Sequence, residues 1–124
     1  MTFESYYGDA LPRLKQLESR LLSLVGQYPV PETAEGLQPI LYCKSRIKTP
    51  ESMMRKLQSR GLPTDSATAL RQMHDAVGIR VVCSFAEDVY LVSHWLQCAK
   101  DLQVVQVKDY IAYPKPNGYR SLHL

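Results

Sequence analysis

Apolar positions in the N-terminal part of the chain recur first at helical spacing and then as a short continuous run. Leucines and a valine are spaced three or four residues apart between positions 11 and 25, which predicts an amphipathic helix over residues 10–27. A polar linker over residues 28–39 separates this helix from Ile40–Cys43, a short apolar run that is typical of a strand. We therefore expect an N-terminal helix over residues 10–27, a linker over residues 28–39 and then the main folded portion, residues 40–124.

The segment after the first strand carries start and stop signals for a second helix. Thr49 can accept a hydrogen bond at the helix N-terminus, Pro50 suits the first helical position, and Glu51 favours its positive end. Gly61 and Pro63 follow and cannot easily continue a helix. The sequence thus predicts a helix that begins just after Thr49.

The remaining pattern alternates between helices and strands without strict repetition. A helical stretch over Asp65–Ala76 precedes the β-branched run Gly78–Phe85, and another helix begins near position 87. Further strands are expected over Leu102–Tyr110 and from Tyr119 to Leu124. The order helix, strand, helix, mixed favours an α+β domain. The last strand begins without any terminating signal, so we expect that the 124 residues are the front part of a domain.

Composition narrows the class of protein. A chain of 124 residues has room for one domain, and its net charge is +3. It contains no apolar run long enough to cross a bilayer. Its three cysteines, Cys43, Cys83 and Cys98, lack the spacing of a zinc site. The N-terminus has no secretory signal pattern. We expect a cytoplasmic protein with reduced thiols and no membrane association.

Positive charge is concentrated between Lys44 and Arg60, which favours an anionic partner. Helix N-termini attract anions through exposed N–H groups and the helix dipole. Four residues enter or line the first turns of the helix after Thr49, and they are candidates for holding a polyphosphate: Arg46, Lys48, Ser52 and Lys56. Solvent-facing cations would produce the same pattern.

Asp75 lies just before the Gly78 strand, and Arg80 lies two residues into that strand. A carboxylate beside cations at the mouth of a strand suits Mg²⁺ on the phosphates of a nucleotide. Read from its residues alone, the segment fits better an Asp75–Arg80 ion pair at the end of a helix. His74 has no partner in the sequence that would orient it as a general base.

A third group of polar and aromatic residues surrounds the turn from Pro114 to Gly118. Aromatic faces beside amide and cationic groups suit a purine base. A hairpin turn explains Asn117-Gly118 equally well, although not the accompanying density of lysine and tyrosine. The candidates are Lys108, Tyr110, Lys115, Asn117, Gly118, Tyr119 and His123.

Neither a P-loop nor a dinucleotide-binding glycine motif is present. Taken in order, however, three segments resemble the RelA/SpoT synthetase family, the GTP pyrophosphokinases of the stringent response, and above all its small single-domain members. The segments are Arg46-Ile47-Lys48-Thr49-Pro50-Glu51-Ser52 with Lys56, Asp75-Ala76-Val77-Gly78-Ile79-Arg80, and Lys108-Asp109-Tyr110-Ile111 with Pro114 to His123. The resemblance implies a nucleotidyltransferase-like mixed β-sheet flanked by helices, here incomplete.

The resemblance also implies roles for individual residues. Arg46, Lys48, Ser52, Lys56 and Arg80 would bind ATP, and Asp75 would be the catalytic residue that ligates Mg²⁺. On the other substrate, Lys108 and Lys115 would neutralise phosphates, Tyr119 would stack on guanine, and Asn117 and His123 would fix GDP or GTP. The 3′-hydroxyl of that nucleotide would attack the β-phosphorus of ATP, a reaction that depends on positioning and charge neutralisation.

Two departures from the family pattern and several alternatives stay open at this point. Ala76 replaces a larger aliphatic residue, and the family's second acidic residue, in a Glu-x-Gln strand, would lie beyond Leu124. We therefore expect the 124-residue chain to bind nucleotides poorly and to turn over little or nothing.

Adenine nucleotides or the 3′ end of tRNA are alternative acceptors. A non-catalytic module that binds RNA or a protein partner through Lys44–Arg60 is a less favoured reading, and a homo-oligomer is expected by resemblance.

Overall fold

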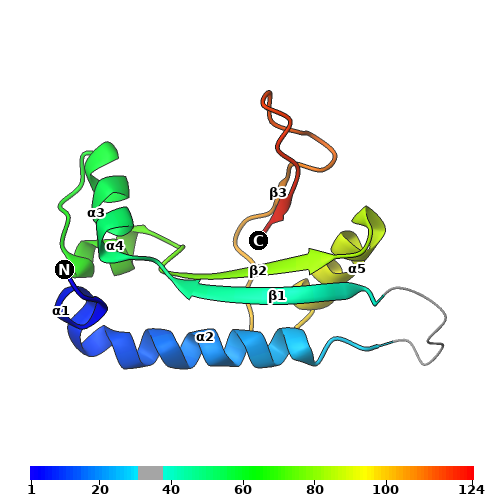
Figure 1. Cartoon of the computed structure of the whole chain (residues 1–124), viewed down its shortest axis with the longest axis horizontal. Helices are drawn as coiled ribbons and strands as arrows, with labels where there is room; N and C mark the ends of the chain where they lie inside the picture. Colours follow the sequence, from blue (N-terminus) through cyan, green and yellow to red (C-terminus); the bar gives the residue numbers. More distant parts are fainter. Residues whose placement is uncertain (31–37) are drawn as a thin grey trace. The chain divides into compact units, whose positions relative to one another are not determined.

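The computed structural model describes residues 1–30 and 38–124 (Figure 1). Residues 31–37, which belong to the expected linker over 28–39, lie outside the described residues. The described chain divides into two compact units, the first formed by Met1–Gly26 and Lys44–Arg80, the second by Gln27–Cys43 and Val81–Leu124. The strands β1 (Ile40–Ile47) and β2 (Val77–Cys83) contribute residues to both units.

Four α-helices of the described chain have bounds that can be compared with the local sequence signals. Helix α2 spans Leu11–Gly26, as the leucine spacing predicts, and α3 spans Pro50–Ser59 with the Thr49 side chain accepting from the Ser52 amide at its N-terminus. Helix α4, Ser66–Gln72, is shorter than predicted, because Met73 already has extended backbone dihedrals. Helix α5 spans Ala86–Gln97, close to the predicted start near position 87.

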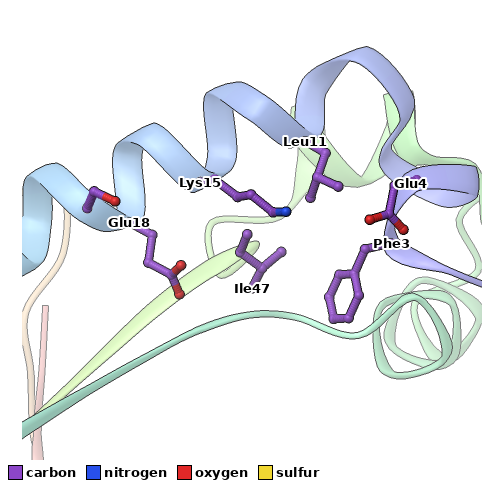
Figure 2. A pocket seen from close by; sticks show the side chains of 7 residues that line it. Phe3, Glu4, Leu11, Lys15, Glu18 and Ile47 are labelled. Atoms are coloured by element: carbon purple, nitrogen blue, oxygen red, sulfur yellow. The ribbon is translucent and has the colours of Figure 1, made fainter.

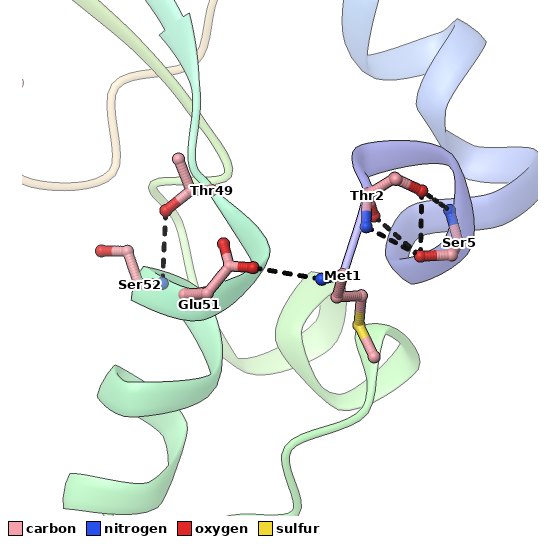
Figure 3. Close-up of polar contacts among 6 residues, drawn as sticks. All are labelled: Met1, Thr2, Ser5, Thr49, Glu51 and Ser52. Carbon is pink, nitrogen blue, oxygen red and sulfur yellow. Dashed lines mark hydrogen bonds and ion pairs between the residues drawn. The ribbon is translucent and has the colours of Figure 1, made fainter.

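The chain begins with a short helix that the apolar spacing did not predict. Helix α1 spans Phe3–Tyr7 and continues through a 3₁₀ turn, Gly8–Ala10, into α2. Thr2 and Ser5 form a reciprocal cap at its N-terminus, each side chain accepting a hydrogen bond from the backbone N–H of the other residue (Figure 3). Nearby in the same figure, the terminal amine lies 3.5 Å from an exposed Glu51 carboxylate oxygen.

Within residues 1–30 and 38–124 the strands form two two-stranded sheets, and together with the helices they give the predicted α+β class. In Figure 1 the arrows of β1 and β2 run in opposite directions, and hydrogen bonds at both ends agree with this. The Lys48 amide donates to the Ala76 carbonyl at 2.8 Å, and the Ser84 amide donates to the Pro39 carbonyl at 3.0 Å. The pairing is therefore antiparallel, and β1 is longer than the predicted Ile40–Cys43.

The second sheet corrects one prediction. Strand β3 covers only Lys108–Asp109 and pairs antiparallel with β4, Leu122–His123, so the predicted strand over Leu102–Tyr110 is wrong for most of its length. Alternating valines favour extended backbone, but a strand forms only where a neighbour accepts and donates its hydrogen bonds. In the described chain, residues 102–107 have no such neighbour.

The core of the first unit is a cluster of buried side chains from α1, α2, α3, α4 and the segment that follows α4. Met53 and Leu57 on α3 are 0% exposed, and burying side chains of this size contributes roughly 1.5–3 kcal/mol each. The other buried members are Tyr6, Tyr7, Leu11, Ala69, Met73 and Ala76. This core holds α3 against the residues on either side of Asp75. No helix in the described chain has the length and apolarity to span a bilayer.

Candidate functional site

Two lysines and one carboxylate meet in the first unit, and we call Lys48, Lys56 and Asp75 the charged cluster. The Lys48 Nζ lies 3.1 Å and the Lys56 Nζ lies 2.7 Å from the same Asp75 oxygen, Oδ2. Lys48 follows β1, Lys56 lies on α3, and Asp75 precedes β2. Of the cations that the sequence analysis placed beside Asp75, Lys48 and Lys56 therefore contact it, and Arg46 lies instead over Gly78.

The backbone around Lys48 explains why these side chains meet. The antiparallel pairing places the Lys48 amide on the carbonyl of Ala76, directly beside Asp75. The Lys48 side chain is only 10% exposed, whereas that of Asp75 is 37% exposed. A largely buried ammonium group is costly unless it is paired, so Lys48 requires the carboxylate more than an exposed lysine would.

The Asp75 carboxylate has one engaged oxygen and one free oxygen. Burial raises its pKa, but the hydrogen bonds from Lys56 and Lys48 outweigh burial, and the net pKa lies below the usual value for aspartate. In the part of the chain that the structure describes, Oδ1 is buried without a hydrogen-bond partner. An unsatisfied carboxylate oxygen is a costly feature in a folded protein, and it requires a physical reason.

The free Oδ1 is compatible with a Mg²⁺ ligand. Within residues 1–30 and 38–124, no group of three or more His, Cys, Asp or Glu side chains gathers to hold a metal ion. Mg²⁺ commonly uses one or two carboxylates and takes its remaining ligands from water and substrate phosphates. The residues present thus fit a metal that arrives with a nucleotide and do not fit a site built from protein ligands alone.

The other residues predicted on the ATP side lie on β1, α3 and β2. The Arg46 side chain passes over Gly78, where its Cγ and Nε would lie 3.7 Å from a Cβ atom on that glycine. Ser52 is half-buried in the first turn of α3, and Arg80 is exposed on β2. The alternative reading of an Asp75–Arg80 ion pair is wrong, because the strand pairing places Lys48 beside Asp75 and the carboxylate engages both lysines.

A second group of residues, the aromatic cluster, lies in the second unit and comprises Tyr110, Lys115, Tyr119 and His123. The Tyr110 and Tyr119 rings meet edge to face at 6.2 Å, and the His123 ring lies edge-on to both. The Lys115 Nζ lies 4.8 Å from the centre of the Tyr110 ring and 5.5 Å from that of Tyr119. Cations at these distances are attracted to the ring faces.

A tight turn places the members of the aromatic cluster. The Gly118 amide donates to the Lys115 carbonyl at 2.8 Å, and Gly118 has a φ of +84°, which favours glycine. The Asn117 Oδ1 accepts from the Tyr119 amide at 3.0 Å. Asn117 is therefore a turn-forming residue in this structure, whereas Lys108 lies opposite His123 in the β3–β4 pair.

His123 is kept in its neutral form more strongly than an ordinary histidine. Burial lowers its pKa, and the positive charges of Lys115 and Lys108 lower it further. Its Nε2 lies 3.0 Å from the Tyr119 hydroxyl oxygen. A neutral ring can accept a hydrogen bond from that hydroxyl, which would fix the orientation of Tyr119.

Sequence reasoning missed one residue that contacts the charged cluster. The hydroxyl of Tyr7, on α1, donates to the Lys48 carbonyl at 2.6 Å across 41 positions of sequence. A tyrosine in an amphipathic helix carries no signal for such a contact, because its partner is a backbone atom of a distant segment.

A pocket of about 420 Å³ also lies in the first unit, between α1, α2 and the end of β1 (Figure 2). Phe3, Leu11 and Ile47 form its apolar part, and Glu4, Lys15, Glu18 and Ser19 supply its polar part. None of the predicted site residues lines this pocket. This pocket is therefore separate from the charged cluster.

Comparison with known proteins places this geometry in a family. The model of the region found in RelA / SpoT proteins matches residues 45–124. GTP pyrophosphokinase YwaC of Bacillus subtilis is 47% identical over 89 residues, covering 72% of this chain and 42% of YwaC. GTP pyrophosphokinase YjbM of the same organism is 32% identical over 114 residues, covering 92% of this chain and 53% of YjbM.

Solved structures agree with these relatives. A GTP pyrophosphokinase family protein from Streptococcus pneumoniae has a TM-score of 0.74 at 30% identity, covering 98% of this chain and 59% of that one. The small alarmone synthetase 1 of Bacillus subtilis, solved with its product pppGpp, has a TM-score of 0.72 at 28% identity, covering 97% and 59%. The chain thus spans about half the length of the relatives it matches. Because the family region matches residues 45–124, well over half of the sequence, this chain belongs to the RelA/SpoT family.

Proposed function

We propose that the protein is a GTP pyrophosphokinase, which transfers pyrophosphate from ATP to the 3′-hydroxyl of GDP or GTP. The single observation that carries this proposal is the convergence of Lys48 and Lys56 on Asp75 in a chain of the RelA/SpoT family. The names of the relatives, and the pppGpp bound to one similar structure, support guanine nucleotides as the acceptor.

The charged cluster would bind the triphosphate of ATP. Asp75 holds two ammonium groups close together before any nucleotide is present. The free energy needed to bring these like charges together is therefore supplied by folding and not by nucleotide binding. Arg46, Ser52 and Arg80 lie in the same unit and would extend the contact along the nucleotide. Asp75 would hold a Mg²⁺ ion, which supplies positive charge beside the phosphate oxygens when bound.

The aromatic cluster would bind the guanine nucleotide. Tyr119 is 43% exposed, which leaves ring surface for a base, and Lys115 with Lys108 would neutralise its phosphates. Asn117 and His123 act in this scheme by fixing the turn and the Tyr119 hydroxyl. In the reaction, the 3′-oxygen bonds to the β-phosphorus of ATP, the bond from that phosphorus to the bridging α–β oxygen breaks, AMP leaves with that oxygen, and the hydroxyl proton is released.

Magnesium, a cytoplasmic location and assembly into a homo-oligomer stay predictions. Turnover is assayed on the protein as its gene encodes it, with ATP, Mg²⁺ and separately GDP, GTP, adenine nucleotides or tRNA. AMP together with a guanine nucleotide heavier by one pyrophosphate is the expected product, detected by mass. Products made only from adenine nucleotides or tRNA would overturn the assigned acceptor.

ATP binding is tested separately on residues 1–124 by NMR titration, which detects weak binding. Lys48→Met and Lys56→Met should each weaken ATP affinity by about tenfold or more, since a charge-assisted contact is worth roughly 1.5–3 kcal/mol. Lys100→Met, which removes an exposed lysine of the second unit, is the matched control and should leave affinity unchanged. Equal affinities in all three variants would contradict the proposed role of the charged cluster.

A further inference from the structure

The N-terminal helix α1 contacts the charged cluster from outside the region that the family model matches. Its last residue, Tyr7, is 3% exposed and packs edge to face on Tyr6 at 4.9 Å. The Tyr7 hydroxyl donates to the carbonyl of Lys48, whose amide is already bonded to Ala76. The backbone of Lys48 is thus held on both sides at the point where the chain passes from β1 into α3.

We propose that Tyr7 is a positioning residue that holds the backbone of Lys48 so that its ammonium group reaches Asp75 and the triphosphate of ATP. The proposal rests on the proposed function for the identity of the nucleotide. The contact between Tyr7 and Lys48 and that between Lys48 and Asp75 are independent of it.

Three features make a positioning role stronger than simple packing. The bond is short, 2.6 Å, and buried, so its loss leaves a buried carbonyl without a partner. Burial, with smaller contributions from Tyr6 and Asp75, raises the pKa of Tyr7 to about 12, so the hydroxyl keeps its proton near neutral pH. Lys48 directly precedes the α3 cap residue Thr49, so a shift of its carbonyl would also move the start of the helix that carries Lys56.

The neighbouring tyrosine offers a matched control. Tyr6 lies on the same helix, is 8% exposed and belongs to the same core cluster. Its hydroxyl also donates to a backbone carbonyl, that of Thr64, at 2.7 Å. The two tyrosines therefore differ mainly in whether the accepting carbonyl belongs to the charged cluster.

The test compares Tyr7→Phe with Tyr6→Phe in the 124-residue chain, each alone and combined with Lys48→Met. Both single variants keep the ring and lose one hydrogen bond, so both should lower the urea midpoint, and Tyr7→Phe should lower it more because its bond is the more deeply buried one. Tyr7→Phe should weaken ATP affinity about fivefold, the equivalent of one hydrogen bond, and Tyr6→Phe should not. In the Lys48→Met background, the effect of Tyr7→Phe on affinity should disappear, because the side chain that it positions is gone.

The outcomes separate this inference from the proposed function. Additive losses of affinity from Tyr7→Phe and Lys48→Met, or equal losses from the two tyrosine variants, would overturn the positioning role while ATP binding stands. If the wild-type chain bound no ATP, the proposed role of the charged cluster in ATP binding would fail and the urea midpoints would decide the inference. If Tyr7 positions Lys48, Tyr7→Phe should lower the urea midpoint less in the Lys48→Met background than in the wild type. An equal loss in both backgrounds would refute the positioning role.

Discussion

The charged cluster is assembled from residues far apart in the sequence, whereas the aromatic cluster comes from one short stretch. Lys48 and Lys56 reach Asp75 across 27 and 19 positions, and Tyr7 reaches Lys48 across 41. Tyr119 and His123 are four positions apart and are placed by a single turn. The charged cluster depends on the core of its unit, while the aromatic cluster depends on local hydrogen bonds, so the two should respond differently to mutation.

The largest expected effect comes from removing the core beneath the charged cluster. Leu57→Ala leaves a cavity at a side chain that is 0% exposed and next to Lys56, and it should cost about 2–5 kcal/mol of the free energy of unfolding. Urea unfolding followed by circular dichroism measures the loss. Leu91→Ala, at a leucine of α5 that is 53% exposed, is the matched control and should change stability little. Equal losses would show that the α3 core is not what supports the cluster.

A smaller loss is expected when the charge at the centre of the cluster is removed. Asp75→Asn leaves the largely buried Lys48 ammonium without its carboxylate and should cost about 1–2 kcal/mol, since Asp75 itself is partly exposed to solvent. Glu51→Gln removes a carboxylate whose ion pair with the terminal amine is exposed on both sides. Glu51→Gln should therefore leave the urea midpoint unchanged. A loss as large as that of Asp75→Asn would contradict the expected difference between the partly buried and the exposed ion pair.

Lowering the pH tests the contribution of the Asp75 carboxylate to stability without changing a core residue. The pKa of Asp75 is lowered in the folded chain, so its contribution to stability is fully present above the unfolded value of about 3.9. That contribution is lost as pH falls below 3.9 and through the lower folded pKa. The urea midpoint of the wild type should therefore fall more steeply over this range than that of Asp75→Asn. The extra fall should not exceed the difference between the two midpoints at neutral pH. Parallel curves would show that the carboxylate is not stabilised.

The smallest effect on stability is expected in the aromatic cluster. Lys115→Met removes an exposed cation from the Tyr110 and Tyr119 rings and should cost about 0.5 kcal/mol or less. The informative measurement is the NMR shift of the two tyrosine rings, which should move while the rest of the spectrum stays unchanged. Shifts that spread into α3 would show that the aromatic cluster is not local.

Features coded by neighbouring residues were predictable, and features that need a distant partner were not. The Thr49-Pro50-Glu51 start of α3 followed from local capping chemistry, and the turn at Asn117-Gly118 followed from the backbone freedom of glycine. The strand over Leu102–Tyr110 failed because strand propensity needs a neighbouring strand to become a ladder. Thr2 and Ser5 signalled α1 only weakly, since serine replaces the glutamate or glutamine usual in such a cap.

The candidate site divides in the same way. That Lys48, Lys56 and Asp75 belong to one site was implied by the resemblance to the RelA/SpoT family. Which cation pairs with Asp75 could not be predicted, because Arg80 is nearer in sequence than either lysine. The antiparallel register decides it by placing Lys48 next to Ala76. Nothing in the sequence pointed to Tyr7, whose contact is to a main-chain oxygen.

The hydrogen bond between the Lys48 amide and the Ala76 carbonyl has a consequence for how this part of the chain can vary in length. Strand pairing fixes the separation of Lys48 and Asp75, so that separation does not depend on how many residues connect α3 to α4. Extra residues inserted between Pro63 and Thr64, which are both exposed, would lengthen the covalent path and leave the ends of the strands in register. We therefore expect this connection to accept a tag or a fluorescent reporter without disturbing the neighbouring lysines.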